Sequence, residues 1–337
     1  MLVASRAVAQ VCFGDLNGDR EVGGADLSVI LDSWGQCDQC LADLDGNGSV
    51  NGADLGSVLI HWGPCPVVTP SWATLVESVP DPSVVPSPTL RAAIVGTGLA
   101  WRVQDSRTGI EMLLVPPGTY LRGCIMGSPQ WPCRQSELPV HEVTLTRAFY
   151  LGRFEVTQSQ WQATMGSNPS EFQEPSAEVP EDQVPFRPVE QVSWSAIQAF
   201  LSATGCRLPT EAEWEFACRA GTQTPFYNDS SDDSTVGQLA WYSANSNSQT
   251  HPVGGKAANG LGFHDMLGNV IERVSDWYST YSSTPQTNPT GPFFGLYRVV
   301  RGGSWSSPGN STRASFRYDY ASIDPFLLVG FRVARNP

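Results

Sequence analysis

The chain has 337 residues and a formal net charge of −13, with 32 glycines, 26 prolines, 11 tryptophans and only 16% charged residues. This length predicts two folded units, and the composition favours a loop-rich, aromatic-rich fold over a helical bundle. The acidic balance excludes a general nucleic-acid-binding protein and favours bound cations, since residues 1–66 hold nine acidic residues against two arginines.

The first residues end in Ala7-Val8-Ala9, a small-residue pattern typical of signal-peptide cleavage, but they lack the long apolar stretch of a complete signal. We interpret residues 1–10 as a signal-peptide remnant; the alternative is a disordered cytosolic N-terminus. Eight cysteines, placed in pairs, favour an oxidising compartment, so we expect a secreted or cell-surface protein. No segment reaches the roughly 18 consecutive apolar residues of a membrane span.

An internal repeat follows, because residues 12–37 recur at 40–65. Each copy places oxygen-bearing residues at alternate loop positions, the spacing of calcium ligands, with the seventh position using its carbonyl. An Asp/Gly turn pair without metal is the alternative, but two full ligand sets in register argue against it. The predicted ligands are Asp15, Asn17, Asp19, Glu21 and Asp26, then Asp43, Asp45, Asn47, Ser49, Asn51 and Asp54.

Each loop feeds an apolar stripe at helical spacing, so one amphipathic helix is expected per copy. Val22 and Val50 are expected to pair the two loops back to back. This duplicated loop-helix pattern resembles dockerin type I repeats, which implies that residues 11–66 form a small α domain that folds with calcium and docks onto a cohesin-like or other protein partner. The stripes are Leu27, Ile30, Leu31 and Trp34, and Leu55, Val58, Leu59 and Trp62.

The cysteines predict disulfides without fixing their map. The four in the repeat allow three pairings, of which we favour Cys12–Cys37 and Cys40–Cys65 because each closes one copy. Cys124–Cys133 and Cys206–Cys218 are further candidates, and the first is the stronger because its span is shorter.

Beyond the repeat, the proline-rich residues 67–95 predict a semi-extended linker, and residues 96–337 predict the large unit. Alternating patterns predict strands at 100–103 and 110–115. Thr210 and Glu213 form a capping-box pattern that predicts the start of a helix, and an apolar stripe predicts another over 195–202.

From about residue 105 to 336, a series of motifs resembles the formylglycine-generating enzyme (sulfatase-modifying factor) family in order and spacing. The resemblance implies an α+β fold, a variant C-type-lectin-like domain with little regular secondary structure. The motifs include Leu114-Val115-Pro116-Pro117-Gly118, Pro188-Val189-Glu190-Gln191-Val192-Ser193-Trp194, Arg207-Leu208-Pro209-Thr210-Glu211, Asp265-Met266-Leu267-Gly268-Asn269-Val270, Arg301-Gly302-Gly303-Ser304-Trp305 and Gly330-Phe331-Arg332-Val333.

The resemblance also implies copper chemistry, but the two residues that would hold the copper are replaced in this chain. Members of the family hold copper with two cysteines placed after the Gly-Gly-Ser-Trp motif, but the matching positions here are Ser307 and Thr312. Hydroxyls are hard ligands that stay protonated near neutral pH, so copper binding and oxidation of a substrate cysteine are not expected. The usual Trp-Glu-Trp is Ile271-Glu272-Arg273, and Leu328 replaces an asparagine. The remaining cleft candidates are Arg273, Ser304, Trp305, Ser307 and Thr312.

Calcium sites in the large unit are implied by the same resemblance. Glu272 with the carbonyls of Gly268 and Val270 matches one ligand set, although Glu272 as a solvated helix-end acid is the alternative. Asn245 and Ser246 match part of a second set.

We therefore expect a calcium-binding protein whose large domain is a binding or structural module, for a peptide or glycan ligand, with a dockerin-like docking tag. The alternatives are a sulfatase-maturation oxidase, another enzyme using the same cleft, and a cell-surface scaffold in which the tag carries the function. The four histidines are scattered, and Gly303-Ser304-Trp305-Ser306 lacks the second glycine of a nucleophile elbow, so hydrolase chemistry has little support.

Overall fold

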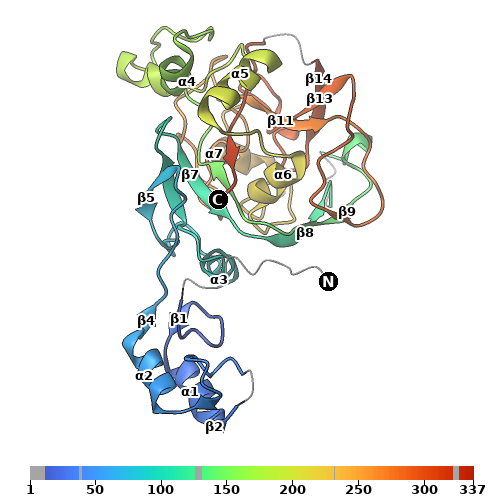
Figure 1. Cartoon of the computed structure of the whole chain (residues 1–337). Coiled ribbons are helices and arrows are strands. Elements are labelled where there is room, and N and C mark those ends of the chain that lie inside the picture. Colours follow the sequence, from blue (N-terminus) through green and yellow to red (C-terminus); the bar gives the residue numbers. More distant parts are fainter. Residues whose placement is uncertain (1–11, 38–39, 126–130, 231, 322–325) are drawn as a thin grey trace.

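The computed structural model describes residues 12–37, 40–125, 131–230, 232–321 and 326–337. The signal-peptide interpretation of residues 1–10 lies outside this part of the chain. Figure 1 shows a small N-terminal unit below a larger body that contains the C-terminus. Among the described residues, every helix is too short or too polar to cross a lipid bilayer.

The small unit contains the two helices that the repeat predicts. Each follows a short strand, and Asp26 and Asp54 at the third helical positions accept backbone hydrogen bonds from their own loops. Val22 and Val50 are both buried, but the expected pairing between the loops is wrong, because β1 pairs with β4 and β2 with β3. The elements are β1 (Glu21–Val22), α1 (Gly24–Asp32), β2 (Gly35–Gln36), β3 (Ser49–Val50), α2 (Gly52–Ile60) and β4 (Gly63–Pro64).

This strand pairing also explains the disulfides of the small unit. The favoured Cys12–Cys37 and Cys40–Cys65 pairs are wrong: the structure joins Cys12 to Cys65 and Cys37 to Cys40. Because β1 lies beside β4, the two ends of the unit meet, and the Cys12 and Cys65 Cα atoms are 5.2 Å apart. The inner pair therefore closes the junction between the two copies.

The proline-rich residues 67–95 are not the extended linker that their composition predicts. They form β5 (Ala73–Glu77), which pairs with β6 (Arg102–Asp105), and α3 (Pro88–Gly96). Pro88 occupies the first turn of α3, where its missing N–H costs nothing, and Ser87 caps the helix. Val85 and Ile94 are buried in the main core, so this segment belongs to the large domain.

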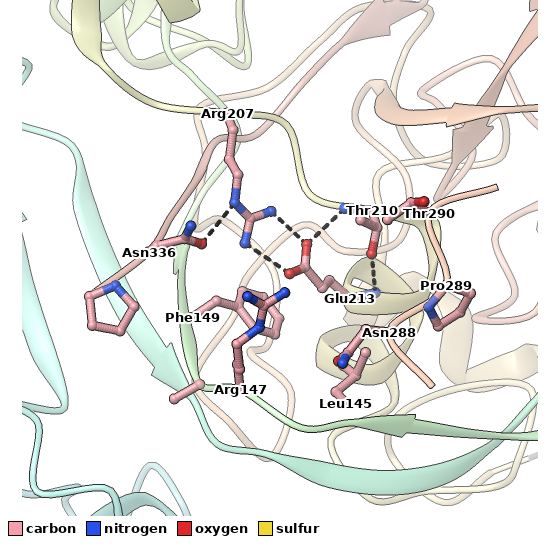
Figure 2. A pocket seen from close by; sticks show the side chains of 12 residues that line it. Leu145, Arg147, Phe149, Arg207, Thr210, Glu213, Asn288, Pro289, Thr290 and Asn336 are labelled. Atoms are coloured by element: carbon pink, nitrogen blue, oxygen red, sulfur yellow. Dashed lines mark hydrogen bonds and ion pairs between the residues drawn. The ribbon is translucent and has the colours of Figure 1, made fainter. Parts of the chain in front are cut away.

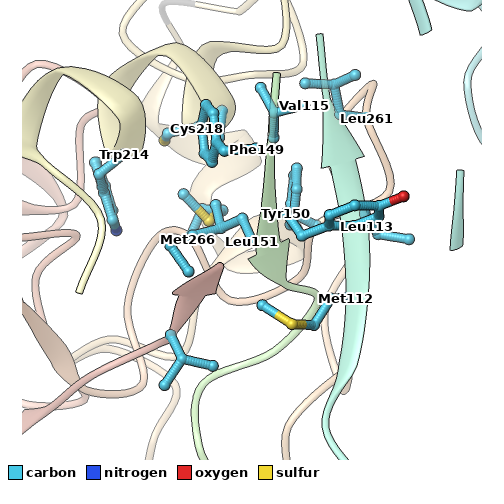
Figure 3. Close-up of a cluster of buried hydrophobic side chains, with 14 of the residues drawn as sticks. Met112, Leu113, Val115, Phe149, Tyr150, Leu151, Trp214, Cys218, Leu261 and Met266 are labelled. Atoms are coloured by element: carbon cyan, nitrogen blue, oxygen red, sulfur yellow. The ribbon is translucent and has the colours of Figure 1, made fainter. Parts of the chain in front are cut away.

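Within the described residues, the large domain contains three antiparallel or mixed sheets around one core. Figure 3 shows part of this core, with side chains from β7, β10 and α6 packed together. The first sheet has the order β16-β10-β7-β6-β5, the second β14-β13-β11-β15 and the third β12-β9-β8. Their strands are β7 (Glu111–Val115), β8 (Gly118–Arg122), β9 (His141–Leu145), β10 (Phe149–Gly152), β11 (Ile271–Trp277), β12 (Gln286–Thr287), β13 (Tyr297–Arg301), β14 (Arg317–Ala321), β15 (Val329–Gly330) and β16 (Ala334–Arg335).

In the part of the large domain that the structure describes, four further helices follow α3, among them the two that the sequence predicts. The capping box of Thr210 and Glu213 is present, and the second predicted helix begins at Trp194. Cys206 and Cys218 are free, contrary to the predicted pairing, because the length of a nine-residue helix separates them. The helices are α4 (Gln158–Met165), α5 (Trp194–Thr204), α6 (Glu211–Arg219) and α7 (Val236–Leu239).

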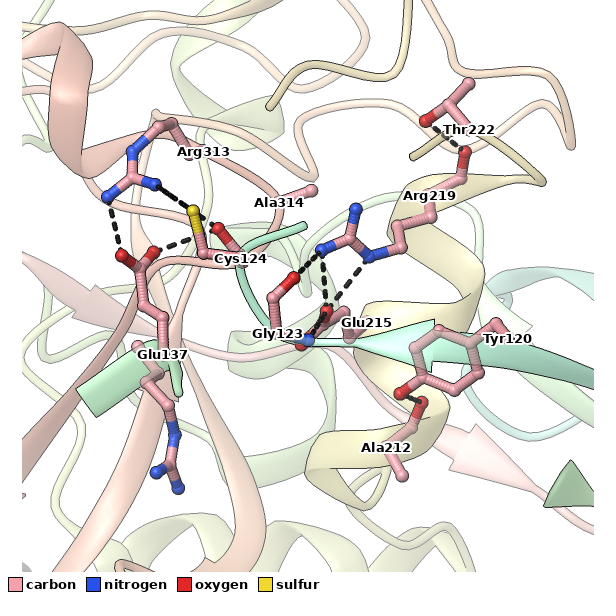
Figure 4. A network of polar contacts seen from close by, with 12 residues as sticks. Tyr120, Gly123, Cys124, Glu137, Ala212, Glu215, Arg219, Thr222, Arg313 and Ala314 are labelled. Atoms are coloured by element: carbon pink, nitrogen blue, oxygen red, sulfur yellow. Dashed lines mark hydrogen bonds and ion pairs between the residues drawn. The ribbon is translucent and has the colours of Figure 1, made fainter. Parts of the chain in front are cut away.

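Buried ion pairs fasten α6 to the sheets. Glu215 accepts hydrogen bonds from Arg219 and Arg301, and from the backbone N–H of Gly123 (Figure 4). Glu211 pairs with Arg122 and Arg317. Burial alone would raise the pKa of Glu211, but the neighbouring guanidinium groups hold that pKa well below its usual range. The helix therefore carries ionised carboxylates into the core.

Candidate functional site

The segment after β13 folds into a tight turn that brings three of the predicted cleft residues together. Gly302 and Gly303 both have positive φ, and a Cβ at Gly303 would lie 2.6 Å from the carbonyl oxygen of Ser311. Only glycine fits there. The backbone can therefore reverse, and Ser304, Trp305 and Ser307 share one turn whose backbone is tied to Asn269 by a 2.8 Å hydrogen bond from the Trp305 N–H.

The hydroxyls at the two thiol positions are engaged within their own turns. Ser307 Oγ lies 3.2 Å from Ser304 Oγ and accepts a 3.0 Å hydrogen bond from the Ser304 N–H. Thr312 is buried and donates to the carbonyl oxygen of Gly309 at 2.7 Å. Both side chains therefore act as turn-stabilising groups in this structure.

Arg273, the remaining cleft candidate, belongs to β11 rather than to this turn. It is buried in β11, and its guanidinium lies 5.6 Å from the ring centre of Tyr320 on β14. Trp305, in contrast, is partly exposed and meets the ring of Phe172 edge-on at 5.4 Å. The aromatic pair Phe172–Trp305 is thus the recognisable surface feature beside the turn.

A cysteine sulfur lies near Thr312, but it belongs to a disulfide. The predicted Cys124–Cys133 bond is present, and Cys124 Sγ lies 3.5 Å from Nη1 of Arg313, the neighbour of Thr312 (Figure 4). The free cysteines, Cys206 and Cys218, are buried, and burial raises the pKa of the Cys218 thiol to about 12. A thiol with that pKa supplies almost no thiolate near neutral pH, and thiolate is the form that binds copper.

The Glu272 carboxylate, a predicted calcium ligand, has protein partners in this structure. Its carboxylate is buried, accepts three hydrogen bonds from Arg332 at 2.6 to 2.9 Å, and accepts another from the Trp214 indole at 2.8 Å. This arrangement argues against the predicted site with the Gly268 and Val270 carbonyls, since the guanidinium already neutralises the charge a cation would need. The solvated alternative is wrong as well.

Asn245 and Ser246 lie next to the candidate turn and also have partners. The Asn245 amide oxygen accepts from the Tyr242 N–H, and its nitrogen donates to the Ala240 carbonyl. Ser246 Oγ donates to the Trp305 carbonyl at 2.7 Å. Asn245 lines an open cavity of about 580 Å³ together with Glu178, Trp241 and His251. These residues therefore join a concave surface to the candidate turn.

The first aspartates of the two N-terminal loops make similar hydrogen bonds, but in the described part of the chain only the second loop gathers three carboxylates. Asp15 and Asp43 begin their loops and accept backbone N–H groups from within them. Within the described residues, carboxylate oxygens of Asp43, Asp45 and Asp54 come within 4.8 Å of one another, which suits a hard cation. A group of Cys12, Asp15 and Cys65 also forms, but its two sulfurs are consumed by a disulfide.

Further members of the two ligand sets stabilise the loops directly. Asn17 accepts from the Asp19 N–H, Asp19 from the Glu21 N–H, and Asn47 from the Ser49 N–H, all at 2.9 Å. Asn51 caps α2 by accepting from the Ala53 N–H. These side-chain oxygens thus stabilise the loops, and their role as calcium ligands stays a prediction.

One residue of the site region was missed by the sequence analysis. Glu190 is buried, and its Oε1 accepts hydrogen bonds from the Glu171 and Phe172 N–H groups at 2.7 and 3.2 Å. It thereby holds Phe172 against Trp305. Its Oε2 has no hydrogen-bond partner among the described residues, and burial raises the pKa of Glu190 to about 7. A charged residue between the apolar Val189 and Val192 was the available signal.

Comparisons with known proteins place this geometry in context. Residues 101–337 match the sulfatase-modifying factor enzyme 1-like domain. The serine/threonine-protein kinase pkn1 of Chlamydia caviae is 32% identical over 246 residues, which cover 67% of this chain but only 38% of the kinase. The formylglycine-generating enzyme of Streptomyces coelicolor is 37% identical over 45% of this chain and 54% of the enzyme. The structure of Treponema denticola variable protein 1 covers 68% of this chain and 95% of that protein, with 27% identity and a TM-score of 0.61.

Proposed function

Because the chain belongs to the sulfatase-modifying factor enzyme 1-like family and carries hydroxyls where the family uses two thiols, we propose that its large domain is a binding or structural module. The observation that carries this proposal is the engagement of Ser307 and Thr312 in their own turns. Soft thiolates are the ligands that select Cu(I), and a hydroxyl cannot form a mixed disulfide with a substrate cysteine.

The surface that suits recognition is the Phe172–Trp305 pair with the adjoining cavity. An exposed aromatic edge beside amide and carboxylate groups, such as Asn245 and Glu178, fits a peptide or glycan ligand. The family fold hosts proteins with different names, including a kinase and a variable protein, so membership alone does not set the activity.

The test is an oxidation assay. The whole chain, loaded with copper, is incubated with oxygen and a cysteine-containing peptide, and the peptide mass is followed. We expect no aldehyde product, with an active family oxidase as positive control. Aldehyde formation at a rate proportional to protein concentration would instead support the alternative, a sulfatase-maturation oxidase.

We further propose that the N-terminal unit is a calcium-dependent docking module of the dockerin kind. Large apolar side chains are exposed at equivalent places of both copies: Leu31 and Trp34 are 55% and 52% exposed, and Leu59 and Trp62 are 53% and 51% exposed. Only Ile30 and Val58 of the two stripes are fully buried. Such a duplicated apolar surface suits a protein partner, such as a cohesin-like module.

A secreted or cell-surface location is part of this proposal. The three disulfides Cys12–Cys65, Cys37–Cys40 and Cys124–Cys133 support it, since such bonds persist in oxidising compartments.

A further inference from the structure

A second concave site lies where β9 and β12 end, and it shares no lining residue with the Ser304–Ser307 turn (Figure 2). The two strands run parallel, with Thr287 paired to Thr144. Leu145 ends β9 at the cavity, and Asn288 follows β12 there. The carboxyl ends of parallel strands are common ligand sites, because neighbouring chains diverge there. The cavity volume is about 350 Å³, the size of a small organic molecule.

The walls of this pocket are fixed by hydrogen bonds. Arg207 makes a bidentate pair with Glu213 at 2.7 and 2.8 Å and donates from Nε to the Asn336 side chain at 3.1 Å. Asn288 has positive φ and exchanges two hydrogen bonds with Thr146, at 2.9 and 2.7 Å. The pocket therefore needs little ordering when a ligand enters.

The floor of the pocket is apolar, and the guanidinium group of Arg147 lies above it without an ion-pair partner among the described residues. Leu145 and Phe149 are almost fully buried beneath the cavity. Arg147 also lines it, and in Figure 2 its side chain rises toward the Arg207–Glu213 pair. Among the described residues, no side chain forms an ion pair or hydrogen bond with the Arg147 guanidinium. The side chains that line the pocket thus include two guanidinium groups and one carboxylate, and the Arg147 side chain is exposed to solvent.

We propose that this pocket binds a small monocarboxylate that carries a compact apolar group. The carboxylate pairs with the Arg147 guanidinium, whose planar donors match its two oxygens. The apolar group lies over Phe149 and Leu145, with Pro289 at the rim. A dianion is disfavoured, because Glu213 neutralises the second guanidinium.

The experiment measures binding of 3-phenylpropionate to the whole chain by saturation-transfer NMR and calorimetry, beside the uncharged 3-phenylpropionamide. We expect saturable binding of the acid and about two- to fivefold weaker binding of the amide, since the ion pair with the exposed Arg147 is lost. Arg147→Gln should reduce acid binding to the level of the amide, while Arg147→Lys should retain part of it.

Arg107→Gln is the matched control, because Arg107 is an exposed arginine outside this pocket, and its variant should bind the acid as the wild type does. Circular dichroism shows whether each variant is folded. Absence of saturable acid binding would overturn the proposal, as would equal binding of acid and amide or an unchanged affinity in Arg147→Gln.

Discussion

The N-terminal unit and the large domain are stabilised by different means. The small unit buries five apolar side chains in its core, and its loops are held by side-chain oxygens and two disulfides. The large domain has a continuous core and buried ion pairs such as Arg332–Glu272. In the small unit, the loop oxygens that stabilise the fold are the same ones that we propose as calcium ligands. The large domain is stabilised by residues other than Ser307 and Thr312, so hydroxyls at these two positions are compatible with its fold.

The largest effect expected in the large domain comes from removing a buried charge. Glu215→Ala leaves Arg219 and Arg301 buried without their carboxylate, which should lower the free energy of unfolding by about 3–5 kcal/mol. Urea unfolding of the whole chain measures it. Glu142→Ala, at an exposed position of β9, should change stability by less than about 0.5 kcal/mol. Equal effects of the two substitutions would contradict the ion-pair account.

A pH-dependent effect should come from Glu190. Its folded-state pKa is about 7, above its ordinary value of 4.5, so its neutral form is favoured in the fold. That contribution is complete below pH 4.5 and is lost as the pH rises through 7, a change of roughly 3 kcal/mol.

Glu190→Gln removes this titration. Relative to the wild type, the variant should therefore gain stability between pH 5 and pH 8 in urea unfolding. Glu181→Gln, at an exposed position, should follow the wild type at both pH values. Parallel pH profiles of the wild type and Glu190→Gln would show that this carboxyl titrates normally.

Calcium removal should destabilise the small unit and leave the stability of the large domain unchanged. Chelation should lower the stability of the small unit by about 2.7 kcal/mol for each calcium loop, relative to calcium at one hundred times its Kd. The large-domain transition should stay in place. Asp54→Ala should abolish the calcium response of its loop, whereas Asp32→Ala, at an exposed helix end, should preserve it. Thermal unfolding followed by circular dichroism checks this, and identical melting with and without calcium would contradict it.

The sequence predicts local features well and long-range ones poorly. Both loop-helix units and the Thr210 capping box could be predicted because their residues are neighbours in the chain. The ion pair between Glu272 and Arg332 could not be predicted, since the two residues are 60 positions apart and their contact depends on the pairing of β11 with β15. The predicted disulfides of the small unit were wrong for the same reason, since the pairing of β1 with β4 decides them, whereas the predicted Cys124–Cys133 bond within one short span is confirmed.

The prolines of residues 67–95 were equally misleading. Their composition is that of a linker, but Pro88 starts α3, and Val85 and Ile94 pack into the core. Composition therefore gave the wrong prediction for this segment, because a few apolar residues decide whether it packs against the core.

The most direct test of the central claim is a Cu(I) competition titration of the wild type and the Ser307→Cys/Thr312→Cys double variant. The wild type should bind no stoichiometric Cu(I) with high affinity, and the variant should bind one equivalent, because two thiols then replace two hydroxyls. Tight binding of one Cu(I) by the wild type, unchanged in the double variant, would contradict the account.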